Sequence, residues 1–171
     1  GLGDVYKRQL YQIQVTFERG NAKQTLTYQL KGNMARKIGN IEEWRQVMKE
    51  HGQDYENIEL TGDIDFSGVT QKELLDEKLV NLKINSIRGN GHTMKNFSYT
   101  AQADGEAMIK TVSGALEDLN FENMKFSAVD GAKKYGGENV GLIGELNGSA
   151  SNLSFDKVTV DLSLIHISEP T

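Results

Sequence analysis

Apolar positions recur along the chain with a long period. Residues 109–126 and 143–160 align without a gap at an offset of 34. The matched pairs are Ile109/Ile143, Gly114/Gly148, Leu119/Leu153 and Phe121/Phe155, which are identical, and Val112/Leu146, Met124/Val158 and Phe126/Val160, which stay apolar. Consecutive copies of one short unit are typical of proteins that stack layers on a shared core. Residues 82–99 follow the pattern approximately, with about one extra residue before Phe97, and are interpreted as a degenerate third copy.

Each clear copy ends in two short alternating stretches that are separated by a corner. Residues 55–66 are also strand-like, with Ile58, Leu60, Ile64 and Phe66 as the apolar positions. Asn120, Asn123 and Asn152 lie near the expected corners, where asparagine tolerates left-handed backbone and forms local hydrogen bonds. Together these features predict an all-β fold that begins a right-handed parallel β-helix, a solenoid of stacked coils.

Residues 41–51 are predicted to form an amphipathic helix. Asn40 is the expected N-cap, Glu43 completes a capping box, and Gly52 ends the helix. One helical face carries the apolar residues Ile41, Trp44, Val47 and Met48. We expect this helix to cover the first coil, with Trp44 as the central plug. The acidic insertion at residues 69–79 predicts a second, short surface helix.

Residues 10–37 are predicted to contain a β-hairpin. Apolar and polar positions alternate over residues 11–18 and 25–30, on either side of a turn at Arg19-Gly20-Asn21. The alternation indicates half-buried strands at the end of a small β module. An edge hairpin of the following domain, residues 38–161, is an equally supported interpretation.

Both ends of the chain are interpreted as non-native. Residues 1–9 back-translate to a DNA sequence that is the reverse complement of most of the one for residues 162–171. This resembles translated adapter from a sequencing library, so residues 1–9 and 162–171 are set aside. His166 and Pro170 then carry no structural meaning, and the parent protein is expected to be longer.

Composition excludes several classes of function. The net charge is −5 without a basic cluster, which argues against a nucleic-acid surface. The chain has no cysteine, so thiol catalysis, disulfides and cysteine-type zinc sites are excluded for it. No apolar run approaches the ~20 residues of a membrane helix.

Three segments carry a resemblance to known proteins: residues 55–68 with DIDFSG, residues 87–97 (IRGNGHTMKNF), and residues 140–148 (VGLIGELNG). Over residues 38–161 the chain resembles the β-helical N-terminal region of Gram-positive IgA-specific zinc metalloendopeptidases and bacterial surface proteins with GLUG-type repeats. Gly136-Gly137 are displaced from the strict GLUG position by Glu138-Asn139. The resemblance implies a β-helix, an extracellular or cell-wall location, and a host protein or glycan as partner.

The candidate metal and phosphate sites are judged from spacing. Neither His51 nor His92 has a second histidine four residues away, so no zinc motif is predicted, and His92 is expected to bond to backbone at a coil corner. Asp63 and Asp65 share a strand face and offer oxygen ligands to calcium. Because Ile64 and Phe66 must be buried, we favour solvent-facing carboxylates that cap turn amides. The lone motif Gly89-Asn90-Gly91 is not expected to bind phosphate.

No catalytic, cofactor-binding or metal residue is therefore predicted. Tyr99, Tyr135 and the loop with Lys133-Lys134 offer a sugar- or protein-binding surface, against the plainer interpretation of a solvated loop. We predict that the chain is a non-catalytic structural and interaction segment of a large bacterial protein. If the resemblance holds for the whole parent, the parent has a zinc peptidase domain elsewhere. The last coil, residues 153–160, is expected to offer an open edge to continuing coils.

Two other functions stay open. A β-helix polysaccharide lyase or hydrolase needs convergent acids, and Glu117, Asp118, Glu122 and Asp156 are not expected to recur in register. An adhesin for a glycan or a host protein is the second alternative.

Overall fold

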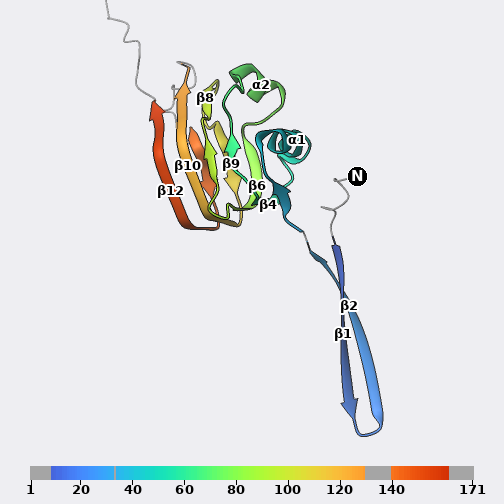
Figure 1. The fold of residues 1–171 in the computed structure, drawn as a ribbon. Coiled ribbons are helices and arrows are strands. Elements are labelled where there is room, and N and C mark those ends of the chain that lie inside the picture. The colour runs from blue at the N-terminus through green and yellow to red at the C-terminus, as the bar shows by residue number, and fades with distance from the viewer. Residues whose placement is uncertain (1–8, 33, 130–139, 162–171) are drawn as a thin grey trace, which may run out of the picture. The chain divides into compact units, whose positions relative to one another are not determined.

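The computed structural model describes residues 9–32, 34–129 and 140–161, and the chain divides into two compact units, residues 1–36 and 37–171 (Figure 1). Apart from Gln9, where the first strand begins, the segments interpreted as adapter lie outside the described residues. Neither helix of the described chain has the length and apolar character needed to cross a membrane.

The first unit is a β-hairpin, as predicted. Strands β1 (Gln9–Arg19) and β2 (Ala22–Gly32) pair antiparallel, and Arg19 opposite Ala22 leaves a two-residue turn in which Gly20 has a φ of +59°. On the face that was expected to be half-buried, Val15 is partly buried, whereas Ile13 is 45% and Phe17 55% exposed. A two-stranded hairpin has no second layer of its own against which to bury a face.

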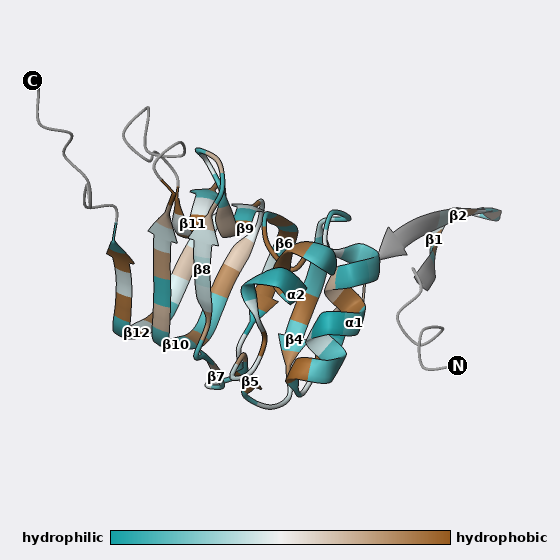
Figure 2. Ribbon diagram, turned by 90° about the horizontal axis from the view of Figure 1, so that it is seen from above, coloured by the Kyte–Doolittle hydropathy of each residue, from teal (hydrophilic) through white to brown (hydrophobic). Residues whose placement is uncertain are grey.

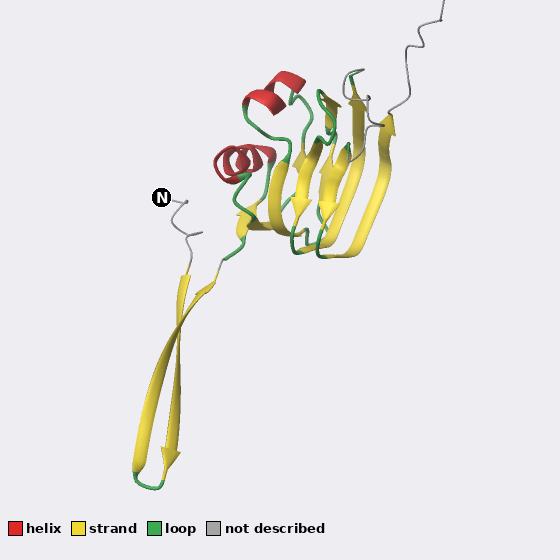
Figure 3. Ribbon diagram, turned by 180° about the vertical axis from the view of Figure 1, so that it is seen from behind, coloured by secondary structure: helices red, strands yellow, loops and turns green. Residues whose placement is uncertain are grey.

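The second unit is mostly β and contains one parallel, strongly curled sheet in the form of a half-barrel (Figures 1 and 3). Its strands are β3 (Arg36–Ile38), β4 (Glu56–Leu60), β5 (Ile64–Asp65), β6 (Leu82–Arg88), β7 (Thr93–Lys95), β8 (Ser98–Ala101), β9 (Ala107–Val112), β10 (Ala115–Ala128), β11 (Gly141–Leu146) and β12 (Ser149–Asp161). Two helices, α1 (Ile41–His51) and α2 (Gln71–Asp76), lie at the end of the unit remote from β12 (Figures 1 and 2).

Strand pairing connects successive stretches of chain in four layers. The first layer, β4 and β5, pairs with β6 and β7; the second, β6 to β8, pairs with β9 and β10; the third, β9 and β10, pairs with β11 and β12. The 34-residue repeat is the in-register pairing of the third layer with the fourth, in which Phe121 lies opposite Phe155. Stacking of consecutive units, the basis of the predicted architecture, is thus present in the described chain.

The degenerate copy at residues 82–99 is the second layer. Its insertion differs from the expected single residue before Phe97. Arg88 pairs with Glu117 and Thr93 with Asn120. Thr93 follows Arg88 by five residues (93 − 88), whereas Asn120 follows Glu117 by three (120 − 117). The two extra residues therefore enlarge the corner after Arg88.

One aromatic column passes through the core of the unit. The ring of Trp44 meets Phe66 edge-on at 6.2 Å, Phe66 meets Phe97 at 5.1 Å, and Phe97 lies 5.5 Å from Phe126. Each of the four side chains is at most 2% exposed. The strands carry their apolar residues at alternate positions, as Figure 2 shows, so every layer contributes one row to this core.

Helix α1 begins and ends where the sequence predicts. The Asn40 side chain accepts a hydrogen bond from the Glu43 amide at 2.9 Å, and the Glu43 carboxylate accepts one from the Gly39 amide at 2.8 Å. Gly52 is the C-cap, as predicted, with a φ of −64° and its amide bonded to the Met48 carbonyl. Glycine is required here by space, since a Cβ would lie 2.4 Å from the Met48 carbonyl oxygen.

Helix α2 lies in the acidic insertion, as expected, and is tied to α1 by charge. Thr70 caps it, and Leu74 is its buried residue. Arg45 of α1 donates to Glu73 at 2.6 Å and, through Nε, to Glu77 at 2.9 Å. The hydrogen bond with Glu77 leads the interactions that raise the pKa of Arg45.

Asparagine holds the corners, but through contacts between layers rather than the local bonds expected. Positive φ values of 50–61° occur in two aligned sets, Asn90/Asp118/Asn152 and Asn96/Asn123/Lys157. The Asn123 amide donates to Asn96 at 2.8 Å and Asn96 donates to Asp65 at 2.9 Å. Asn120 is not among the residues with positive φ, but its side chain also reaches the previous layer, donating to the Gly91 carbonyl at 2.8 Å. Corner side chains thus form ladders that fix the register of the layers.

Candidate functional site

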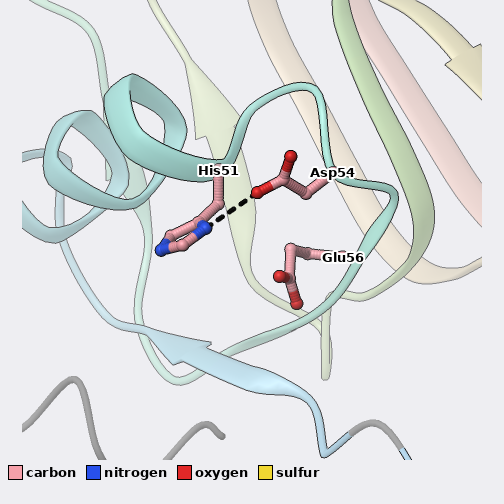
Figure 4. Close-up of side chains that lie close together, drawn as sticks. All are labelled: His51, Asp54 and Glu56. Carbon is pink, nitrogen blue, oxygen red and sulfur yellow. Dashed lines mark hydrogen bonds and ion pairs between the residues drawn. The ribbon is translucent and has the colours of Figure 1, made fainter. Parts of the chain in front are cut away.

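The structure brings together one histidine and two acids that the sequence did not predict as a cluster. His51, Asp54 and Glu56 each offer a ligand atom, and these atoms lie within 4.8 Å of one another (Figure 4). His51 Nδ1 is 2.9 Å from Asp54 Oδ2. The spacing His-x-x-Asp-x-Glu at the end of a helix was the available signal.

The fold positions this cluster with backbone hydrogen bonds. The chain leaves α1 at His51 and turns through Tyr55, whose φ is +54°, before β4 begins. The Tyr55 amide donates to the Lys83 carbonyl at 3.1 Å, and the Lys83 amide donates to Gly52 at 2.7 Å. The His51–Asp54 hydrogen bond lies next to the negative end of the helix and, with these backbone bonds, holds the turn in place.

Asp63 and Asp65 cap turns, as favoured from the sequence. Asp63 accepts from the Thr93 amide at 2.9 Å. One oxygen of Asp65 accepts from the Ser67 amide, the Ser67 hydroxyl and the Asn96 side chain, at 2.6–2.9 Å. These hydrogen bonds, led by the Ser67 hydroxyl, lower the pKa of Asp65 to about 2. This oxygen of Asp65 therefore bonds both to its own turn and to the next layer.

His92 lies at a corner, as expected, with its ring beside a carboxylate. The His92 amide donates to Gly89 at 2.9 Å, and its carbonyl accepts from the Asn120 amide at 3.1 Å. The ring Nδ1 is 3.5 Å from Asp63. The main chain of His92 makes these backbone bonds, whereas its ring lies beside the Asp63 carboxylate.

The segment Gly89-Asn90-Gly91 uses its amides to join layers. The Gly89 amide donates to Glu117 and the Gly91 amide donates to Asp118, both at 2.8 Å. A Cβ on Gly89 would lie 2.4 Å from the Asp118 carbonyl oxygen. The interpretation that this motif is not a phosphate loop agrees with these bonds, because a phosphate needs amides that point outward.

Tyr99 is not available to a ligand, so its predicted place in a sugar- or protein-binding surface is wrong. Its side chain is 2% exposed, and its hydroxyl contacts Glu106. Burial and this hydrogen bond raise the pKa of the Tyr99 hydroxyl. It faces inward because it lies in register with Phe126 of the core. Lys133, Lys134 and Tyr135 lie outside the described residues.

The terminal layer exposes several apolar side chains along an open edge. In the described chain β12 pairs with β10 alone and β11 with β9 alone, so the outer edge of this layer has no strand beside it. Leu146 is 40%, Phe155 58% and Val160 48% exposed, although their counterparts in the third layer are buried. Phe155 stacks on Phe121 at 5.3 Å and leaves its other face uncovered. This edge matches the expected open end of the last coil.

Charged residues form two columns on the outer face of the sheet. One column is Glu59, Arg88 and Glu117, and the other is Asp65, Lys95 and Glu122. In both columns, the base of the second layer lies between an acid of the first layer and an acid of the third. Arg88 Nε is 3.6 Å from the Glu117 carboxylate. The charges therefore alternate from layer to layer.

The alternation stops at the fourth layer. Ser151 lies opposite Glu117, and Asp156 lies opposite Glu122. The expectation that the acids do not recur in register is thus wrong for Glu122 and Asp156. The repeat places them at equivalent positions of two paired strands, and both are exposed.

No family model, curated protein or solved structure matches this chain. The layered sheet, its open terminal edge and its columns of charge are the features of the described chain that bear on function.

Proposed function

We propose that the chain is a non-catalytic structural and interaction segment of a large secreted or cell-wall-bound bacterial protein. Its curled sheet is the start of a right-handed parallel β-helix, α1 covers the first coil, and the coils continue past the fourth layer. The single observation that carries the proposal is the terminal layer, which has an inward-facing apolar row and, within the described residues, no strand at its outer edge.

The two ends of the sheet differ in the way expected of a segment that starts an array. At the first layer the buried Trp44 of α1 packs on Phe66, so the core is closed there. At the fourth layer Phe155 and Val160 continue the buried rows of Phe121 and Phe126 into solvent. Burying such a row releases roughly 25 cal/mol per Å² of apolar surface, which favours a further layer.

In this proposal the parent is related to IgA-specific zinc metalloendopeptidases, in their N-terminal region, or to GLUG-repeat surface proteins. An extracellular or wall-anchored location and a host protein or glycan as partner are parts of the same proposal. They rest on the quoted motifs, which include the DIDFSG turn where Asp65 caps Ser67.

Recovery of the full-length gene tests this function. We expect further coils after residue 161, an export signal, and a cell-wall anchor or a His-Glu-x-x-His helix elsewhere in the parent. The proposal would be refuted if the full-length gene encodes a cytosolic protein. It would also be refuted if the sequence after residue 161 lacks strands with alternating apolar residues.

A further inference from the structure

The fourth layer ends in a mismatch of charge as well as in exposed apolar side chains. In the first three layers an acid always faces a base across a strand pair in the two columns. Asp156 breaks this order because its in-register neighbour on β10 is the acid Glu122. Like charges directly opposite each other on paired strands are destabilising.

The effect of a cross-layer charge is visible within the second column. Lys95 lies in register with Asp65 and is among the groups that lower the pKa of Asp65. A base in the next layer would act on Asp156 in the same way. Asp156 would then have Glu122 on one side and a cation on the other. Glu117 already has such a cation beside it, Arg88.

We propose that the open edge of β12 takes a parallel strand that carries a basic residue opposite Asp156. The same strand presents apolar residues opposite four residues of β12 that continue the buried rows of the third layer. These four are Leu153, Phe155, Val158 and Val160. The inference rests on the proposed function and adds to it the chemistry of the strand that docks. The occupant is a further layer of the array, with the register that β12 already has on β10.

The experiment adds one layer to the chain. A copy of residues 128–161 is inserted between Asp161 and Leu162, so that the whole chain is retained. Three versions carry Asp, Ser or Lys at the copy's counterpart of Asp156. Hydrogen exchange of the β12 amides reports whether the inserted layer docks, because amides on the open side of β12 gain partners only when a strand lies beside them.

We expect the amides of β12 to be protected in all three versions, in the order Lys, Ser, Asp. The Lys and Asp versions should differ roughly 3- to 10-fold in the equilibrium constant for opening of β12, as expected for reversing one cross-strand charge pair. A Lys at the copy's counterpart of Ser151 is the matched control. It adds the same charge opposite a neutral residue and should give no comparable gain.

A background variant isolates Asp156. With Asp156→Asn in the original fourth layer, the advantage of the Lys version over the Ser version should disappear. If the advantage persists in that background, the base does not act through Asp156 and the inference is overturned.

The remaining outcomes separate this inference from the proposed function. Equal protection in the Lys, Ser and Asp versions supports a docked layer but overturns the charge requirement. No protection of β12 in any version overturns both.

Discussion

Asp65 stabilises a turn of the first layer through its charge. One carboxylate oxygen accepts three hydrogen bonds, two from Ser67 and one from Asn96, and the pKa of Asp65 falls from 3.8 to about 2. A group whose pKa is depressed by folding adds stability above its unfolded pKa, and this stability is lost as the pH falls through the folded value. The relevant window therefore lies between about pH 4 and pH 2.

Replacing Asp65 with asparagine should remove this contribution while keeping an oxygen that accepts hydrogen bonds. We expect Asp65→Asn to lower the free energy of unfolding by ~1 kcal/mol at pH 6, a value discounted for partial exposure. The difference from the unmodified chain should shrink toward zero by about pH 2. Urea unfolding at a series of pH values measures it, with Asp63→Asn as the control for loss of charge at the neighbouring turn. A difference that stays constant with pH would contradict this account.

Lys157 occupies a corner that asparagine fills in the two preceding layers. Its φ is +55°, close to the +61° of Asn96 and the +50° of Asn123. Left-handed backbone costs most residues roughly 1 kcal/mol or more, whereas asparagine offsets part of this with its side chain. The Asn123–Asn96 bond shows how an asparagine at this corner reaches the previous layer.

We therefore expect Lys157→Asn to raise the free energy of unfolding by about 0.5–1 kcal/mol. Lys157→Ala is the matched control, because it removes the same lysine without supplying the amide. Thermal or urea unfolding distinguishes the two variants. Equal stability of the Asn and Ala variants would show that the amide adds nothing at this corner.

Residue positions on faces were predictable from the sequence, but partners across layers were not. The alternation around Ile64 and Phe66 was sufficient to place Asp63 and Asp65 outside the core. The partner Asn96 is 31 residues away from Asp65, and only the layer register identifies it. Tyr99 was misplaced for the same reason, because its row in the core depends on the pairing with Phe126.

Among the elements, α1 was predictable almost to the residue because its signals are local. The cap at Asn40, the apolar face and the break at Gly52 all lie within one segment. The curled sheet depends instead on pairing between segments 27–34 residues apart. The insertion at the corner after Arg88 shows the consequence, since its size and place were evident only from the pairing on both sides.

Helix α1 is held on the sheet by Trp44. The side chain is fully buried against Phe66, and its Nε1 has no hydrogen-bond partner in the described structure. We expect Trp44→Ala to lower the free energy of unfolding by ~3–5 kcal/mol, the range for loss of a buried large aromatic side chain. Trp44→Phe should cost much less, because it keeps the aromatic contact and removes the unpaired donor.

Urea unfolding and hydrogen exchange of residues 41–51 measure both variants. Arg45→Met is the control for loosening α1 without emptying the core, since it removes only the bonds to Glu73 and Glu77. If Trp44→Phe is as damaging as Trp44→Ala, the aromatic contact is not what holds the helix.

On the scale of the whole molecule, the stacking of layers followed from the repeat, and the open edge followed from the position of its second copy. The charge columns could not be predicted from the sequence, because only the pairing register shows that a base in one layer lies opposite an acid in the next. Arg88 and Glu117, for example, are 29 residues apart in the sequence. The exposed apolar edge and the mismatched Asp156 lie on the same strand, so β12 is a template for pairing with another strand.

We expect the chain to self-associate through this strand, with an apparent mass that rises with protein concentration. An unpaired strand with exposed apolar side chains is a template for further pairing, and charge at such an edge suppresses it. The double variant Phe155→Lys, Val160→Lys should therefore shift the chain toward monomer in multi-angle light scattering. The cost in stability should be small, since both side chains are about half exposed already. Ile13→Lys with Phe17→Lys is the matched control, because it places the same two charges on the exposed face of the hairpin. Association that persists in the β12 variant but disappears in the hairpin variant would assign it to the first unit and refute the prediction.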